Sequence, residues 1–174
     1  MKRPFNTAGG GANTNRNGLE FERITELRDA FLEHPRYKID GDTVIDGATD
    51  LPVGTLFEKN KLYKNLLEPH GIDHKQIISK QLLPDGAILV GGTLYIIEKK
   101  YQETSGSADE KLQTAHFKKR QYERLVQQMG LRVAFYYLLN DWFRDPSYRD
   151  VLAYIEDVGC RYFFKEIPLE ELGL

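Results

Sequence analysis

Residues 84–100 read PDGAILVGGTLYIIEKK, and this stretch decides how the chain folds. Two apolar runs with strong β-propensity, 87–90 and 93–97, flank the dipeptide Gly91-Gly92. Consecutive glycines between two such runs indicate a two-residue hairpin turn, because both positions can adopt positive φ. We therefore predict two antiparallel strands that are joined by a tight turn.

The predicted turn fixes which residues face each other across the hairpin. If Val90 pairs with Thr93, the numbers of paired residues add up to 183 throughout, and Asp85 lies opposite Glu98. Directly opposed residues place their Cβ atoms about 4.5–5.5 Å apart on one face. Lys100 lies two residues beyond Glu98 and therefore points to the same face. The register thus predicts two carboxylates and one ammonium group at the open end of the hairpin.

Both faces of this hairpin are apolar apart from these charged residues. The face that carries the acids holds Ala87, Leu89, Leu94 and Ile96, and the other holds Ile88, Val90, Tyr95 and Ile97. A strand that is apolar on both faces is normally a central strand covered by helices. Charged residues at its end therefore indicate a site at the rim of the sheet, whereas at the end of an edge strand they would be solvated surface charges.

Two adjacent carboxylates repel each other and require a compensating cation. Lys100 alone is one candidate, and a divalent metal ion is the other. Mg²⁺ prefers carboxylate and water oxygens, and it usually binds through one or two carboxylates together with substrate phosphates. Beside a phosphodiester, such an ion activates water and stabilises the leaving oxygen. A neighbouring lysine can orient or deprotonate that water.

The remaining elements are predicted from hydrophobic spacing and from chain breakers. We expect helices at 18–33, 56–67, 109–129 and 148–158, a weakly alternating strand at 37–46 with a turn at Gly41-Asp42, and strands at 132–139 and 161–164. Residues 1–17 are polar and rich in Gly and Asn, which predicts a flexible arm. Residues 18–174 then form a single domain. This order of elements predicts an α/β fold with a central mixed β-sheet flanked by helices.

The overall composition limits the possible classes of protein. The 24 Lys and Arg residues against 26 Asp and Glu residues give a net charge of -2, which argues against a protein that coats DNA but permits local basic patches. Cys160 is the only cysteine, so the chain forms no intrachain disulfide. The sequence contains neither an apolar run of transmembrane length nor a signal peptide, so we expect a cytoplasmic protein without a membrane partner.

Pro84-Asp85 followed by Glu98-Lys99-Lys100 resembles the PD-(D/E)xK motif of the restriction-endonuclease-like nuclease superfamily. The expected elements also resemble the shared core of that family, which is a helix, a three-strand meander, a helix and a further strand. The resemblance implies a restriction-endonuclease-like core. It also implies that Asp85 and Glu98 bind Mg²⁺, for which Mn²⁺ can substitute, and that Lys100 assists the attacking water.

Many members of this family carry a further glutamate on the first core helix that reaches the metal site. Glu22 is our first choice for this part and Glu20 the second. The alternative for either residue is an acid in the first turn of a helix, where it stabilises the helix dipole.

The resemblance implies double-stranded DNA as the substrate. Side chains that contact phosphates are mostly basic or polar. Such residues lie in the arm, in the loop after Lys100 and on the predicted long helix, although a charged helix face is alternatively a solvated surface. The candidate DNA-binding residues are Arg3, Arg16, Asn17, Gln102, Ser105, Ser107, Lys111, Gln113, Lys118 and Lys119.

The function favoured by the sequence is that of a sequence-specific, Mg²⁺-dependent endonuclease, a type II restriction enzyme. A small chain without an accessory domain fits a homodimer whose two-fold symmetry matches a palindromic site. A cognate DNA methyltransferase is then expected in the same genome. The alternatives are a junction-resolving or repair nuclease, an inactive nucleic-acid-binding or assembly module, and a phosphodiesterase that acts on other substrates. The intact Asp85, Glu98 and Lys100 argue against the inactive module.

Overall fold

The strands of the protein form one mixed sheet. The computed structural model describes residues 16–21, 26–104 and 107–174. Its seven strands follow the order of the chain, from β1 to β7. They are β1 (Tyr37–Asp40), β2 (Thr43–Asp46), β3 (Leu51–Phe57), β4 (Gly86–Val90), β5 (Thr93–Lys100), β6 (Arg132–Leu139) and β7 (Arg161–Phe164). Neighbouring strands are antiparallel from β1 to β5, whereas β6 runs parallel to β5 and β7 parallel to β6. The predicted α/β class with a mixed sheet is confirmed.

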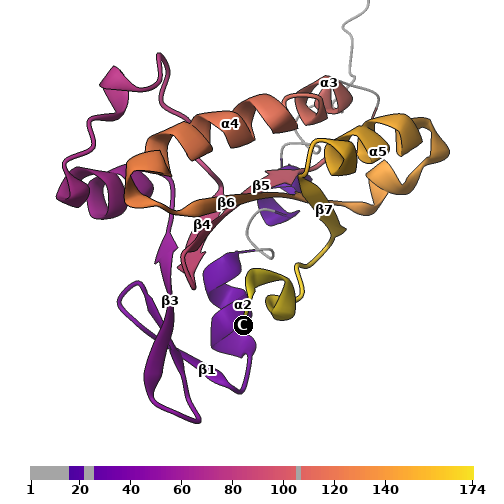
Figure 1. The fold of residues 1–174 in the computed structure, drawn as a ribbon. Helices are drawn as coiled ribbons and strands as arrows, with labels where there is room; N and C mark the ends of the chain where they lie inside the picture. The colour runs from indigo at the N-terminus through magenta and orange to yellow at the C-terminus, as the bar shows by residue number, and fades with distance from the viewer. Residues whose placement is uncertain (1–15, 22–25, 105–106) are drawn as a thin grey trace, which may run out of the picture.

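Helices cover both faces of this sheet (Figure 1). The α-helices are α2 (Leu27–Glu33), α3 (Ala108–Leu112), α4 (Ala115–Val126) and α5 (Arg149–Asp157). Shorter helical turns are Leu62–Leu67, which is π-helical, and the 3₁₀ turns Glu68–His70, His74–Gln76, Gln127–Met129, Asp141–Arg144, Pro146–Tyr148 and Leu169–Leu172. Figure 1 shows α3, α4 and α5 on one side of the central strands and α2 on the other. In the described part of the chain, no helix has the length and apolar character that a membrane span requires.

The alternation of side chains along the strands creates two hydrophobic layers. On the α4 side, Ile96 and Phe135 pack with Tyr122 and Leu125 of α4 and Ile155 of α5, and all five are buried. On the α2 side, Phe31 packs in a cluster with Ile88 and Tyr136, and Phe21 in another with Ile97 and Leu138. Burial of this many large apolar side chains on both faces makes β4 to β6 the rigid centre of the fold.

The central hairpin has the predicted turn and register. Gly91 and Gly92 adopt φ values of 54° and 81°. The pairing runs from Val90 with Thr93 to Gly86 with Ile97. The predicted position of Asp85 opposite Glu98 depends on this register, which is confirmed from Gly86 with Ile97 to Val90 with Thr93.

Two predictions for residues 37–67 require correction. The expected strand over 37–46 is a hairpin, β1 and β2, which turns at Gly41 and Asp42 as predicted. The expected helix over 56–67 is wrong at its beginning, because Leu56 and Phe57 belong to β3 and pair with Ile88 and Ala87. The helical part is limited to Leu62–Leu67 and the residue before it. Pairing with β4 thus outweighs the helical spacing of these leucines.

The predicted N-terminal helix over 18–33 is not continuous. Residues 16–21 are helical, residues 22–25 lie outside the described residues, and Glu26 has an extended backbone with φ -61° and ψ 126°. Arg16 and Asn17 are therefore helical instead of part of an arm. The rest of the predicted arm, 1–15, lies outside the described residues.

The predicted long helix over 109–129 is divided between α3 and α4. The carbonyl oxygen of Lys111 accepts hydrogen bonds from the amide and hydroxyl of Thr114, at 3.2 and 2.6 Å, and from the hydroxyl of Tyr137 at 3.1 Å. These bonds satisfy a carbonyl at the end of α3 that would otherwise continue the α-helical ladder. The break lets α4 begin with Ala115 and directs one face of it against β5 and β6.

Candidate active site

Asp85 is fixed to the neighbouring strand at the open end of the central hairpin. It directly precedes β4, and its Oδ2 accepts a 2.7 Å hydrogen bond from the backbone amide of Lys99. This bond lies next to the last backbone pair, Gly86 with Ile97. The strand pairing ends at Gly86 with Ile97, so the predicted pairing of Asp85 with Glu98 is not part of the sheet, and Asp85 reaches β5 through its carboxylate, which accepts from the amide that directly follows Glu98.

Glu98 is a buried carboxylate that contacts two lysines. Its Oε2 lies 3.1 Å from Nζ of Lys100 and 2.5 Å from Nζ of Lys118, which comes from α4. The residue is only 5% exposed, so both ion pairs are shielded from bulk water. A carboxylate at such a depth requires close positive charge, and the two ammonium groups provide it.

Lys100 has additional contacts that hold it in the site. Its ammonium group donates to the carbonyl oxygen of Lys99 at 2.9 Å and lies 5.9 Å from the ring centroid of Tyr137. Lys100 and Glu98 lie on the same side of β5, as the alternation of the strand predicts. The predicted trio of Asp85, Glu98 and Lys100 is thus brought together at the end of one hairpin.

A tyrosine hydroxyl on α4 lies close to the same carboxylates. The Tyr122 side chain is fully buried, and within the described part of the chain its hydroxyl has no hydrogen-bond partner. Burial raises the pKa of Tyr122, and the negative charges of Glu98 and Asp85 raise it further. The group therefore remains a neutral hydroxyl. A buried hydroxyl without a partner, within electrostatic reach of two carboxylates, is a position where a water or a bound group would be stabilised.

The donor set fits Mg²⁺ in its usual mode of binding. The hydrogen bonds from described residues to the two carboxylates all end on one oxygen of each, Oδ2 of Asp85 and Oε2 of Glu98. Among residues 16–21, 26–104 and 107–174, no group of three or more His, Cys, Asp or Glu residues is arranged to hold a metal ion. A full protein cage is therefore absent from the described chain. Mg²⁺ needs only one or two carboxylates when waters and phosphate oxygens complete its coordination.

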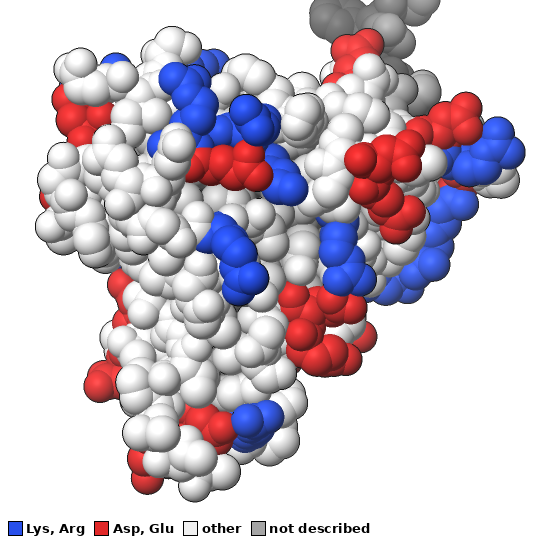
Figure 2. Space-filling view, in the orientation of Figure 1, with Lys and Arg blue, Asp and Glu red and all other residues white. Residues whose placement is uncertain are grey.

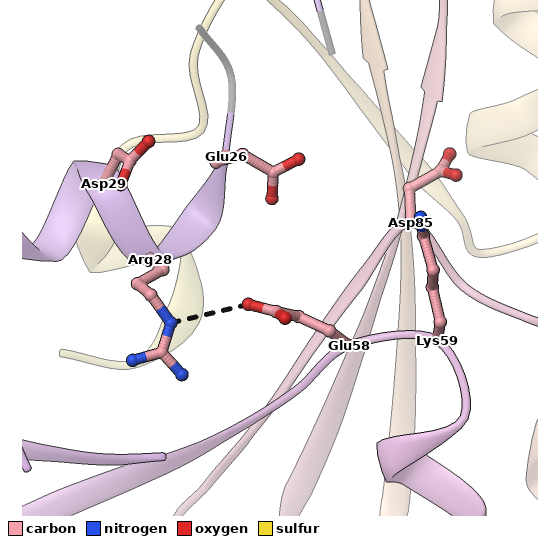
Figure 3. A pocket seen from close by; sticks show the side chains of 6 residues that line it. All are labelled: Glu26, Arg28, Asp29, Glu58, Lys59 and Asp85. Carbon is pink, nitrogen blue, oxygen red and sulfur yellow. Dashed lines mark hydrogen bonds and ion pairs between the residues drawn. The ribbon is translucent and has the colours of Figure 1, made fainter. Parts of the chain in front are cut away.

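An acidic pocket opens beside Asp85 on the α2 side of the sheet (Figure 3). It has a volume of about 260 Å³ and is lined by Glu26, Arg28, Asp29, Glu58, Lys59 and Asp85. Figure 3 shows Glu26 and Asp85 on opposite sides of the pocket and Glu58 directed toward Arg28, with which it forms a 3.4 Å ion pair. Glu26 also lies 3.1 Å from Nζ of Lys99, whose side chain is 2% exposed.

Glu22 and Glu20 are the two residues predicted to supply a third acid to the metal site. Glu22 lies outside the described residues. Glu20 is exposed, and its neighbour Phe21 packs against Ile97, on the face of β5 opposite to Glu98. The described acid from the N-terminal region that reaches the central hairpin is Glu26, through Lys99. Sequence reasoning missed Glu26, because the predicted helix ran through it.

The structure separates the candidate DNA-binding residues into three groups. Arg3 and Ser105 lie outside the described residues. Arg16, Ser107 and Lys111 are exposed. The others contact neighbouring residues. Lys118 contacts Glu98, Lys119 donates to the carbonyl of Gly159 at 2.9 Å, and Asn17 donates to the exposed Glu103 at 2.9 Å. Gln102 is 6% exposed, with its Nε2 3.4 Å from the Tyr148 hydroxyl, whereas Gln113 is exposed and lines a pocket with Val151 and Tyr154.

The positive charges over α4 are partly neutralised on the face shown in Figure 2, where Lys and Arg side chains surround acidic ones. Glu123 lies 3.9 Å from Lys119 and 3.8 Å from Arg120. Two of the lysines predicted to bind phosphate along this helix therefore already have partners within the protein. Lys118 contacts the Glu98 carboxylate, and Lys119 donates to a backbone carbonyl. The spacing of Lys118 four residues before the buried Tyr122 is the signal that could have placed both on the sheet-facing side.

No protein-family model, curated protein or solved structure matches this chain. The candidate site thus rests on its own geometry. That geometry comprises Asp85, whose carboxylate accepts from the amide that follows Glu98, the buried Glu98, which two lysines contact, and a buried hydroxyl from α4.

Proposed function

We propose that this protein is a Mg²⁺-dependent endonuclease that hydrolyses phosphodiester bonds of double-stranded DNA, and that Mn²⁺ can substitute. The observation that carries the proposal is the convergence of Asp85, Glu98 and Lys100. Asp85 is held by the Lys99 amide at 2.7 Å, and Lys100 lies 3.1 Å from Glu98. Two carboxylates and a lysine at one end of a buried hairpin supply the kinds of ligand and base that metal-assisted hydrolysis needs.

The order of elements supports the finer assignment to a restriction-endonuclease-like fold. α2 comes before the antiparallel meander β3-β4-β5, and α4 then crosses to β6, which is parallel to β5. This is the order of helix, three-strand meander, helix and strand that the family resemblance implies. β1 and β2 extend the sheet beyond β3, and β7 extends it beyond β6.

The chemistry follows from the groups present. Asp85 and Glu98 would hold the ion, which when bound supplies activation of water and stabilisation of the leaving oxygen. Lys100 orients the attacking water and offsets the negative charge that develops on the phosphate. In the overall reaction the water oxygen attaches to phosphorus, the bond to one ester oxygen breaks, and that oxygen leaves with a proton.

The proposal extends to a type II restriction enzyme in the cytoplasm. Two copies of the chain would form a homodimer that cuts both strands of a palindromic site, and a DNA methyltransferase would protect the host genome. Exposed Arg16, Ser107 and Lys111, together with Arg3 and Ser105, are the proposed phosphate contacts. Glu22 is the proposed third acid of the metal site.

The test is digestion of plasmid and phage DNA with Mg²⁺ by the natural chain and by Asp85→Asn and Lys100→Ala. Lys64→Ala is the matched control, because Lys64 is exposed and lies on the helical turn Leu62–Leu67, outside the hairpin. We expect discrete fragments from the natural chain and from the control, and none from the two site variants. Full cleavage by Asp85→Asn or Lys100→Ala would contradict the site. Cleavage of branched substrates alone would indicate a junction-resolving enzyme, and retarded but intact DNA would indicate a binding module.

A further inference from the structure

Lys118 forms the shortest ion pair of the candidate site. It lies on α4, 20 residues after Glu98 in the chain, and its Nζ is 2.5 Å from Glu98 Oε2. Lys100 approaches the same oxygen at 3.1 Å. One carboxylate oxygen of the proposed metal site is therefore shared by two ammonium groups.

The charges of this cluster balance without a metal ion. Asp85 and Glu98 carry two negative charges, and Lys100 and Lys118 carry two positive ones. A divalent cation at Glu98 would lie beside two ammonium groups, and at a few ångströms in a partly buried site such repulsion is substantial. This repulsion acts whichever oxygen of Glu98 binds the metal, so we expect one of the lysines to withdraw from Oε2 when the metal binds.

The contacts of the two lysines indicate which one withdraws. Lys100 also donates to the carbonyl of Lys99 and lies against the ring of Tyr137, so it keeps partners when it leaves Glu98. For Lys118, Glu98 is the partner found among the described residues. The Lys118 side chain is 21% exposed, so part of it already reaches the surface. Its flexible four-carbon stem allows the ammonium group to move outward without a change in α4.

We propose that Lys118 is a displaceable internal cation, which neutralises Glu98 in the absence of metal and turns to a DNA phosphate once the metal binds. This inference rests on the proposed nuclease function and adds a coupling between its two ligands. The metal releases an ammonium group that binds phosphate, so each ligand raises the affinity for the other, as linkage requires. Lys118 is therefore a positioning residue, because the place of its ammonium group determines the affinity of the site for DNA.

The coupling predicts effects of opposite sign on the two ligands when the charge of Lys118 is removed. Lys118→Met should bind Mn²⁺ more tightly, by about threefold to tenfold, because the competing ammonium group is gone. The same variant should bind DNA more weakly in the presence of metal. The slope of the logarithm of DNA affinity against the logarithm of salt concentration should fall by about one, since one phosphate contact is lost.

The experiment is a titration of the purified protein with Mn²⁺, followed by the paramagnetic resonance signal of the free ion. Lys118→Arg keeps the charge and should resemble the natural chain, and Lys64→Met controls for loss of an exposed lysine. DNA affinity is measured with Mn²⁺ in a Lys100→Ala background, which retains both acids and prevents cleavage during the measurement. Thermal melting checks that each variant is folded. If Lys118→Met fails to fold, Lys118→Gln takes its place with the same expected signs.

Tighter Mn²⁺ binding together with weaker DNA binding would support the proposal. Unchanged or weaker Mn²⁺ binding by the variant, with clear binding by the natural chain, would overturn it while leaving the nuclease proposal intact. If the natural chain and Asp85→Asn both fail to bind Mn²⁺, the metal site itself is wrong, and both proposals fall together.

Discussion

The backbone amide of Lys99 donates a 2.7 Å hydrogen bond to Oδ2 of Asp85, so this carboxylate is tied to the strand that carries Glu98. Hydrogen bonds to an ionised acceptor are stronger than those between neutral groups. The bond gives Asp85 two separable properties. It is an acceptor that closes the hairpin, and it is an anion in the candidate site.

Substitutions at Asp85 should separate these two properties. In Asp85→Asn the amide oxygen can still accept from Lys99, so we expect stability within about 1 kcal/mol of the natural chain, whereas cleavage should fall at least 100-fold, on the order of 3 kcal/mol of transition-state stabilisation. In Asp85→Ala the Lys99 amide loses its acceptor, which should cost about 1–3 kcal/mol of stability in addition. Urea unfolding and cleavage assays measure the two effects. Equal stability of the Asn and Ala variants would show that the bond contributes nothing.

The glycine turn that sets the register of Asp85 and Glu98 can also be tested. Gly91 has a φ of 54°, and a Cβ added there would meet no atom within 4 Å. Asn tolerates this conformation and reduces the freedom of the unfolded chain, so Gly91→Asn should stabilise the protein by about 0.5 kcal/mol. Gly91→Val should instead destabilise it by about 1–2 kcal/mol, because a β-branched residue is strained at positive φ.

Denaturant unfolding of the two Gly91 variants and the natural chain provides the comparison. The opposite signs are diagnostic, since both substitutions add bulk at one exposed position and differ mainly in their tolerance of left-handed backbone. Destabilisation by both variants would mean that the turn needs glycine for a reason other than its φ.

The central hairpin could be predicted because its turn admits one register, and a shift by one residue would turn Asp85 away from its partner. β3 could not be predicted in the same way. Its sequence, LPVGTLF, contains Pro52 and Gly54, which normally weaken a strand assignment. The structure accommodates Pro52 next to a register shift between Val44 and Ile45. Irregular pairing of this kind depends on the neighbouring strand and leaves no local signal.

Parts of the candidate site were equally inaccessible to sequence reasoning. Asp85, Glu98 and Lys100 lie within one hairpin, so local geometry places them. Lys118 and Tyr122 reach the same site only because α4 packs on the face of β5 that carries Glu98. Glu26 reaches Lys99 because the chain is extended there, where helical spacing predicted a continuous helix. Contacts between distant segments are decided by packing, which no single stretch encodes.

The turn between β2 and β3 should make stability depend on pH. Asp46 accepts from Arg36 at 2.8 and 3.1 Å and from the Ala48 amide at 2.8 Å, and these bonds lower its pKa from the ordinary value. The folded state therefore holds the proton of Asp46 less tightly than the unfolded state does. The contribution of Asp46 to stability is complete above the unfolded pKa of about 3.9 and is lost as the pH falls through the lower folded pKa.

Comparison with Asp46→Asn isolates this contribution from those of other carboxylates. The natural chain should be more stable than the variant at pH 7, and the difference should shrink as the pH is lowered from about 4 to 2. Urea unfolding at several pH values measures it, and substitution of the exposed Asp40 of β1, Asp40→Asn, is the control that should show little change. A difference that stays constant down to the lowest pH would rule out the charge of Asp46 as its cause.

We expect the buried hydroxyl of Tyr122 to contribute to cleavage and not to the stability of the folded chain. Within the described part of the chain it has no partner, and burial of an unsatisfied polar group costs about 1–3 kcal/mol. Tyr122→Phe removes only this group from a fully buried ring. We therefore expect the variant to be more stable by about 1 kcal/mol in urea unfolding.

If the hydroxyl binds a water or a substrate group next to Asp85 and Glu98, cleavage by the stabilised variant should nevertheless fall, by roughly tenfold for the loss of one hydrogen bond. Leu125→Ala, which opens a cavity on the same helix, provides the contrast, because it should lower stability by about 2–5 kcal/mol. A Tyr122→Phe variant that is both less stable and fully active would place the hydroxyl in an ordinary structural hydrogen bond to internal water and remove it from the site.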